Sequence, residues 1–170
     1  MKKNTFFILR LAIKIYYYII FIMINKDPSE LLQILREKCS QNNLKLTPQR
    51  IAIFEVLSAC ADHPSADNIY QKIKKRFPSL SFDTVNRTLL TFAKIGITKV
   101  VEGRGDPKRF DPNLLPHHHF RCTRCGSIED IFHESFDRLA VPESLKKHYL
   151  IHDKKVVLEG LCQKCQKALR

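Results

Sequence analysis

The sequence predicts an α+β chain made of two parts. Between residues 29 and 95, apolar side chains recur at helical spacing, and a residue suited to capping a helix precedes most of these runs. From residue 117 onward, the pattern changes to short strands and contains two Cys-x-x-Cys pairs. A chain of 170 residues is long enough for one ordinary domain or two small ones.

The first 22 residues differ from the rest and are expected to be a leader. They carry four basic residues and no acidic one, and the run Ile15 to Ile24 holds ten residues without charge. A bilayer span needs about 20 apolar residues, so we expect no membrane partner. No small-x-small cleavage site follows, which argues against a secretory signal. The leader is either disordered or the product of a misassigned start, with translation beginning at Met23.

Four helices are expected next. Ser29 to Ser40 is the first, and Thr47 caps the second, which opens on Pro48. The second helix carries an apolar stripe of Ile51, Phe54 and Leu57, with Ala52 and Val56 beside it. Ser65 caps a third helix, Ala66 to Phe77, which Pro78 stops. Ser81 caps a fourth, which Gly96 ends.

The fourth helix and the segment after it suggest DNA binding. One helix face is apolar, and the other carries Thr84, Asn86 and Arg87. A β-hairpin follows, with strands at Ile97–Glu102 and Lys108–Phe110 and a turn at Gly103–Asp106. Helices followed by a hairpin form a winged helix-turn-helix, here over residues 23–110, whose last helix would enter the major groove. The polar residues named are its candidate DNA contacts, although any small helical bundle would fit the same pattern.

The charge balance agrees with a polyanionic partner. Lys and Arg total 29 against 17 acidic residues, which gives a net charge of +12. Without the four charges of the leader, the chain remains at +8. A generally basic soluble protein would show the same excess, so charge alone does not decide the partner.

After a linker at residues 111–116, residues 117–170 predict a small α/β domain. Strands are expected at His117–Arg121, Ser127–Phe132 and Val156–Leu161, and Phe136–Tyr149 should be partly helical and broken near Pro142. Cys122, Cys125, Cys162 and Cys165 form the two Cys-x-x-Cys pairs, and 36 residues separate the pairs. Two such loops can close a four-thiolate structural zinc site. We expect Cys60 to be a small buried hydrophobe.

A second set of metal ligands precedes the first cysteine pair. His117, His118 and His119 are consecutive, and imidazoles mixed with carboxylates suit iron, manganese or zinc in exchangeable sites. Because side chains alternate along a strand, we expect His118 to face solvent. His133 and His148 are interpreted as surface histidines. Together with the zinc site, this pattern indicates a metal sensor.

Several motifs in one collinear order resemble the ferric uptake regulator (Fur) superfamily. They are Leu46–Arg50, Asp62–Tyr70, Thr84–Leu89, Arg109–Asp111, His117–His119 and the two cysteine pairs. The resemblance implies a cytoplasmic, homodimeric, metal-dependent repressor that binds double-stranded operator DNA through its winged helix and dimerises through its α/β domain. It implies no enzymatic activity. The genes under its control would serve metal homeostasis or the oxidative-stress response.

The resemblance also implies a regulatory metal between the two domains. Its ligands fall on a set of histidines and aspartates, namely His63, Asp111, His117, His119 and Asp130. Aspartate at both carboxylate positions is similar to the peroxide-sensing PerR branch, whereas iron sensors usually carry glutamate there. This favours Fe²⁺ or Mn²⁺ as the regulatory ion. It also implies that peroxide oxidises His63 and His117. An iron-responsive or a zinc- or manganese-responsive repressor remains the alternative.

Two departures from the family pattern bear on function. Asn86 stands where the recognition helix usually has tyrosine, and asparagine can bind adenine through two hydrogen bonds. Lys154 stands where many relatives have a histidine of a further metal site, with His152 two residues away. We therefore expect no complete third site.

Other functional classes fit less well. A metallohydrolase needs a general base and a substrate pocket, which the sequence does not mark. A dithiol oxidoreductase needs one Cys-x-x-Cys rather than two matched pairs. A zinc-binding interaction module that does not bind DNA remains possible.

Overall fold

The computed structural model describes residues 28–101 and 107–169. The chain divides into two compact units, Met1–Leu114 and Leu115–Arg170. The expected leader, the alternative start at Met23 and the hairpin turn Gly103–Asp106 lie outside the described residues. In the described ranges, no helix combines the length and the apolar character that a bilayer crossing requires.

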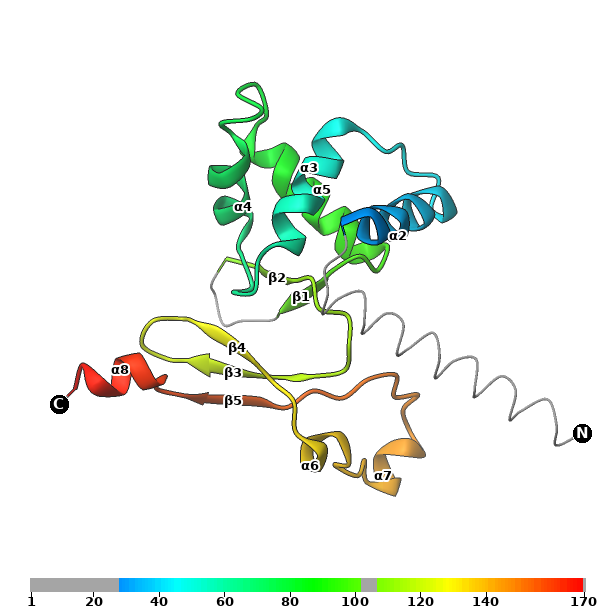
Figure 1. Cartoon of the computed structure of the whole chain (residues 1–170). Helices are drawn as coiled ribbons and strands as arrows, with labels where there is room; N and C mark the ends of the chain where they lie inside the picture. Colours follow the sequence, from blue (N-terminus) through cyan, green and yellow to red (C-terminus); the bar gives the residue numbers. More distant parts are fainter. Residues whose placement is uncertain (1–27, 102–106, 170) are drawn as a thin grey trace, which may run out of the picture. The chain divides into compact units, whose positions relative to one another are not determined.

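In the part of unit 1 that the structure describes, four helices are followed by the two strands of a hairpin (Figure 1). The helices are α2 (Pro28–Gln41), α3 (Pro48–Ser58), α4 (Ala66–Ile73) and α5 (Phe82–Lys94). Three predicted caps are confirmed: the side chains of Thr47, Ser65 and Ser81 each accept a hydrogen bond from the backbone N–H three residues later. Gly96 follows α5 with a φ of +72°, the left-handed conformation that ends helices.

α4 is shorter than the sequence predicts. It ends at Ile73 instead of Phe77. After the helix ends, the backbone N–H groups of Arg76 and Phe77 donate turn hydrogen bonds to the Ile73 carbonyl, at 2.9 and 3.0 Å. The residue before a proline disfavours helical backbone, so the helix cannot run up to Pro78.

The core of unit 1 lies among all four helices. Leu35, Ile53, Leu57, Ile69, Leu89, Phe92 and Phe110 are each 0% exposed. The predicted stripe of α3 is shifted, because Ile53 is fully buried whereas Ile51 is only half-buried. The helix contacts α2, α4 and α5, so its apolar surface covers more than one face. Cys60 is buried as expected, and its Sγ also accepts a hydrogen bond from the Lys72 ammonium at 3.2 Å.

The hairpin pairs β1 (Lys99–Val101) with β2 (Arg109–Asp111) in antiparallel register. Val100 lies opposite Phe110, which anchors the hairpin in the helical core. Asp111 is the last residue of β2, opposite Lys99. The buried Thr98 hydroxyl donates a hydrogen bond to the Asp111 carbonyl at 2.6 Å and fixes this end of the strand.

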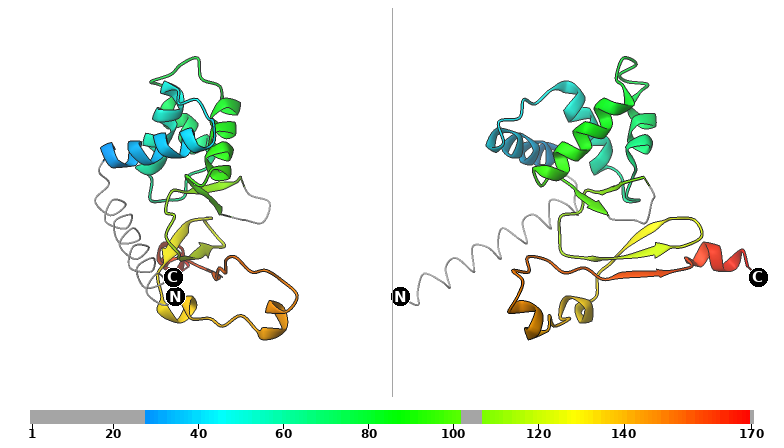
Figure 2. Two further views of the ribbon diagram at one scale, coloured as in Figure 1. Left: turned by 90° about the vertical axis from the view of Figure 1, so that its right-hand side faces the viewer. Right: turned by 180° about the vertical axis from the view of Figure 1, so that it is seen from behind.

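Unit 2 is a three-stranded sheet with three short helices. The strands are β3 (His118–Cys122), β4 (Ile128–Ile131) and β5 (Val157–Gly160), in the order β4-β3-β5. β3 is antiparallel to β4 and parallel to β5. The helices α6 (Glu134–Asp137) and α7 (Glu143–Lys146) lie on the crossover, and α8 (Gln163–Lys167) follows β5. Figure 2 shows α8 at the opposite end of the sheet from α6 and α7.

The expectation that His118 faces solvent is wrong. Its side chain is 3% exposed. Its Nδ1 accepts a hydrogen bond from the backbone N–H of Val156 at 3.1 Å, its Nε2 lies 3.3 Å from Asp137 Oδ1, and its ring packs edge-on against Phe136. The crossover covers this face of β3, which strand alternation alone does not reveal. His133 and His148 are exposed, as expected.

Candidate metal centres

The sheet topology brings the two cysteine pairs together. Cys122 ends β3 and Cys162 follows β5, and these strands are parallel, so their carboxyl ends meet at one edge of the sheet. The Thr123 N–H donates to the Gly160 carbonyl at 2.8 Å, and the Arg124 guanidinium donates to the Cys165 carbonyl at 3.1 Å. These bonds tie one Cys-x-x-Cys loop to the other across 36 intervening residues.

The four sulfurs fit a zinc ion. One Sγ from each of Cys122, Cys125, Cys162 and Cys165 lies within 4.8 Å of the others. The Cys125 and Cys162 sulfurs are 3.8 Å apart. Sulfurs at tetrahedral angles and about 2.3 Å from zinc are separated by about 3.8 Å. The predicted four-cysteine cluster is therefore confirmed.

The local hydrogen bonds prepare thiolates at this cluster. The backbone N–H of Cys162 donates to the Cys122 sulfur at 3.3 Å, and this bond is the main cause that lowers the Cys122 pKa to about 6. A hydrogen bond with the Ser127 hydroxyl lowers the pKa of Cys125. Burial raises the pKa of Cys165 to about 12.

A second ligand set lies on β3 and β4 of unit 2. His117 directly precedes β3 and His119 lies within it, two residues further along the chain, and Asp130 of β4 lies directly opposite His119. The two Nε2 atoms are 3.0 Å apart. Asp130 Oδ1 lies 3.4 Å from His117 Nε2 and 3.7 Å from His119 Nε2. Two imidazoles and a carboxylate thus converge, and metal-bound nitrogens at right angles and about 2.1 Å from an ion would stand about 3.0 Å apart.

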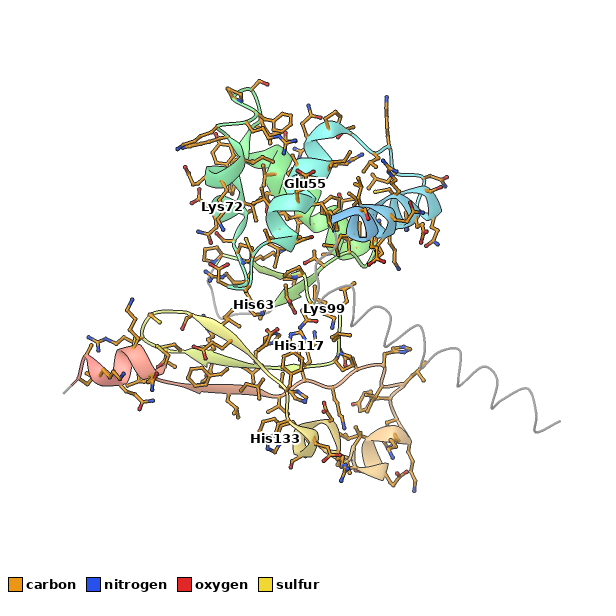
Figure 3. The ribbon with its side chains drawn as sticks, viewed as in Figure 1. Glu55, His63, Lys72, Lys99, His117 and His133 are labelled. Atoms are coloured by element: carbon orange, nitrogen blue, oxygen red, sulfur yellow. The ribbon has the colours of Figure 1, made fainter. Side chains whose placement is uncertain are left out.

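The hydrogen bond of His117 fixes its tautomer. Its Nδ1 lies 2.8 Å from the Leu115 carbonyl, which can only accept, so Nδ1 carries the proton and Nε2 offers a lone pair. His117 is labelled in Figure 3. The Leu115 carbonyl therefore holds the His117 ring with its Nε2 available to a metal ion.

Unit 1 contributes another pair of candidate ligands. His63 lies in the loop before α4 (Figure 3), and its Nε2 is 3.9 Å from Asp111 Oδ1 at the end of β2. Both side chains are buried. The Asn113 N–H donates to Asp111 Oδ1 at 2.7 Å, which holds the carboxylate in place.

The candidate DNA contacts lie on α5. Thr84 and Arg87 are exposed and Asn86 is half-buried. The Arg87 Nε donates to Asp83 Oδ2 at 2.9 Å, one helical turn earlier. The Thr84 hydroxyl lies 2.9 Å from that of Ser81, the residue that caps the helix.

The sequence did not identify every residue that shapes these centres. Three supporting groups are visible only in the structure. They are the Leu115 carbonyl beside His117, the Asp137 carboxylate beside His118, and Arg109, which binds the His63 carbonyl. The Lys154 ammonium donates to the Asp137 and Leu139 carbonyls, while His152 is exposed. Lys154 and His118 thus both contact Asp137.

Residues 41–159 match the Ferric uptake regulator family. This chain belongs to that family. As a Fur-family member, it is a metal-dependent transcriptional repressor and not an enzyme. Regulators of this family bind operator DNA as dimers.

Relatives of known function refine the comparison. The chain is 35% identical over 128 residues to the peroxide-responsive repressor PerR of Staphylococcus saprophyticus. The aligned residues cover 74% of this chain and 84% of the relative. It is 34% identical over 129 residues to PerR of Staphylococcus aureus, spanning 74% of this chain and 85% of that protein.

Solved structures show the same fold. The Helicobacter pylori ferric uptake regulator has a TM-score of 0.70 at 23% identity, covering 82% of this chain and 93% of that one. A zinc uptake regulator complexed with zinc and DNA has a TM-score of 0.61 at 23% identity, covering 84% and 97%. The Fur-family fold predicted from the sequence is thereby confirmed.

Proposed function

We propose that this repressor senses peroxide through a regulatory metal. The ligands are His117, His119 and Asp130 of unit 2 with His63 and Asp111 of unit 1. The observation that carries the proposal is the convergence of two imidazoles and one carboxylate at 3.0–3.7 Å on β3 and β4. Two histidines and one carboxylate form the set typical of non-haem Fe²⁺, and they leave coordination positions open.

One ion would link the two units. The three ligands of unit 2 leave a six-coordinate ion incomplete, and His63 and Asp111 are nitrogen and oxygen ligands of the same kind. An ion that takes ligands from both units restricts how the DNA-binding unit is oriented. Metal occupancy would then select the orientation that fits the operator.

Peroxide would act on the ligands themselves. Fe²⁺ held by His117, His119 and Asp130 together with His63 and Asp111 would supply the redox chemistry that activates peroxide beside these side chains. An imidazole of His63 or His117 gains one oxygen atom from H₂O₂, its ring carbon loses a hydrogen, and one water leaves. The oxidised ring donates less strongly to a metal, so the ion is released and the constraint between the units is lost. The likeness to peroxide-responsive repressors supports this assignment.

The DNA contact would come from unit 1. Thr84, Asn86 and Arg87 occupy the outward face of α5, and the chain carries a net charge of +12. We place α5 in the major groove of a double-stranded operator and the hairpin on the phosphate backbone. Zinc at the four cysteines would be structural, whereas Fe²⁺ or Mn²⁺ would be regulatory.

Unit 2 would form the homodimer. β5 lies at an edge of the sheet, and its Val157 and Leu158 are 52% and 41% exposed. Tyr149 and Leu150, on the chain leading to it, are 65% and 84% exposed. An apolar edge strand is a place for another chain to pair, and a second copy would bury this surface.

A simpler repressor is the alternative. It would release DNA when iron, zinc or manganese becomes scarce, without any oxidation. To separate the two, the Fe²⁺-loaded and Mn²⁺-loaded proteins are titrated on duplex from the promoter of its own gene, before and after brief exposure to low peroxide. We expect peroxide to abolish binding only with Fe²⁺. Equal retention of binding with both metals would remove the peroxide claim, and absence of salt-dependent duplex binding would remove the repressor assignment.

A further inference from the structure

Arg109 fastens the loop that carries a proposed metal ligand. Its Nε donates a hydrogen bond to the His63 carbonyl at 2.6 Å, and its Nη2 lies 3.5 Å from the Asp62 carbonyl. The main chain adds to this attachment, because the Phe110 N–H donates to the Pro64 carbonyl at 2.9 Å and Ser65 forms a β-bridge with Arg109. The loop 62–65 is thus bound to β2 through both a side chain and the backbone.

The backbone of His63 needs such support. Its φ is +48°, in the left-handed region that residues other than glycine seldom occupy. A residue persists in this conformation only where its surroundings hold it there, and such residues cluster at ligand sites. The Arg109 bond acts on the carbonyl of His63 itself, and therefore on the peptide that follows the left-handed residue.

We propose that Arg109 is a positioning residue for the regulatory metal, holding His63 in the conformation that directs its imidazole toward Asp111. This inference rests on the proposed function. The same residue serves both ligands of unit 1: its backbone continues along β2 to Asp111, two residues later, and its side chain holds His63. Without the Arg109 guanidinium, the loop 62–65 would be less restrained, and the His63 imidazole would adopt several orientations.

The chemistry of arginine suits this role. Its planar guanidinium directs several N–H groups at fixed angles, so it can address two adjacent carbonyls, whereas a lysine ammonium sits on a flexible stem. Arg109 is half-buried with its Nε committed to a carbonyl, while the neighbouring Lys108 is exposed. Lys108 therefore provides a charge-matched control next to Arg109 in the sequence.

The test measures metal affinity apart from folding. Full-length, zinc-containing wild type, His63→Ala, Arg109→Gln, Arg109→Lys and Lys108→Gln proteins are titrated with Mn²⁺ by calorimetry, and the thermal unfolding of each is recorded without added Mn²⁺. We expect Arg109→Gln to bind Mn²⁺ about 10- to 100-fold more weakly, the range typical when a residue that supports a ligand is lost. Arg109→Lys should be intermediate, and Lys108→Gln should match wild type.

Each outcome separates the inference from the proposed function. If wild type binds no Mn²⁺ beyond the zinc site, or if His63→Ala binds it as wild type does, the proposed site fails. If His63→Ala loses binding but both arginine variants bind like Lys108→Gln, the role of Arg109 fails. A lower unfolding temperature with unchanged Mn²⁺ affinity would make Arg109 purely structural. Should Arg109→Gln not fold, the affinity of Arg109→Lys relative to Lys108→Gln decides.

Discussion

His119 and Asp130 face each other directly across the antiparallel pair β3 and β4. The neighbouring pair in this register is His118 with Ile131, so a slip of one residue would place the wrong histidine opposite the carboxylate. The register therefore decides which of three consecutive histidines can share an ion with Asp130.

His119→Ala should abolish binding of the regulatory metal, while His118→Ala should retain it. His119 Nε2 lies beside both His117 and Asp130, whereas His118 points to Val156 and Asp137. Loss of the buried His118 bonds should instead reduce stability by about 1–3 kcal/mol. Mn²⁺ titration and chemical denaturation of both variants distinguish the roles. Equal loss of Mn²⁺ binding in the two would contradict the register argument.

Cys122→Ser should release zinc and disrupt the dimer. Structural zinc contributes on the order of 10 kcal/mol of apparent binding energy that is coupled to folding, and here it joins the carboxyl ends of β3 and β5. Metal analysis and sedimentation provide the measurement. Cys60→Ser, which alters a buried thiol in unit 1, is the control and should keep both zinc and dimer. A folded, dimeric, zinc-free Cys122→Ser protein would refute a structural role.

Arg87→Ala should weaken operator binding by about 1–3 kcal/mol if the side chain reads a base. Asp83 pairs with the Arg87 guanidinium on the exposed face of α5. Arg76→Ala removes the same charge from an exposed arginine paired with Glu55 and serves as the control. Duplex titrations at several salt concentrations compare the two. Equal effects would indicate that only overall charge matters at this position.

Asn86→Tyr should change which operator is preferred and not simply abolish binding. Asparagine can pair with the N6 and N7 edge of adenine, a contact that tyrosine cannot reproduce. Selection of bound sequences from a random duplex pool, performed for wild type and variant, reveals the difference. Identical selected sequences would place base recognition on other residues.

Local chemistry made much of the fold predictable. Thr47, Ser65 and Ser81 cap their helices because short polar side chains satisfy the first backbone N–H groups. The cysteine pairs could be assigned because spacing and residue type together specify a tetrahedral thiolate site. Each cap and each Cys-x-x-Cys pair is a signal contained within a few consecutive residues.

The remaining features depend on contacts between distant segments. His118 is buried because the crossover covers it, and no alternation pattern in β3 contains that information. The left-handed backbone of His63 and its bond to Arg109 join residues 46 positions apart. The sequence therefore indicates which residues carry the chemistry, while their support becomes visible only in the fold.

Mass spectrometry of the Fe²⁺-loaded protein after brief exposure to low peroxide tests the central claim most directly. The peptides carrying His63 or His117 should each gain one oxygen atom, and operator binding should fall in proportion. The Mn²⁺-loaded protein, treated identically, should show neither change. Intact histidines, with oxidation confined to Cys39, Cys60 or methionine, would contradict peroxide sensing and leave a repressor that responds to metal supply.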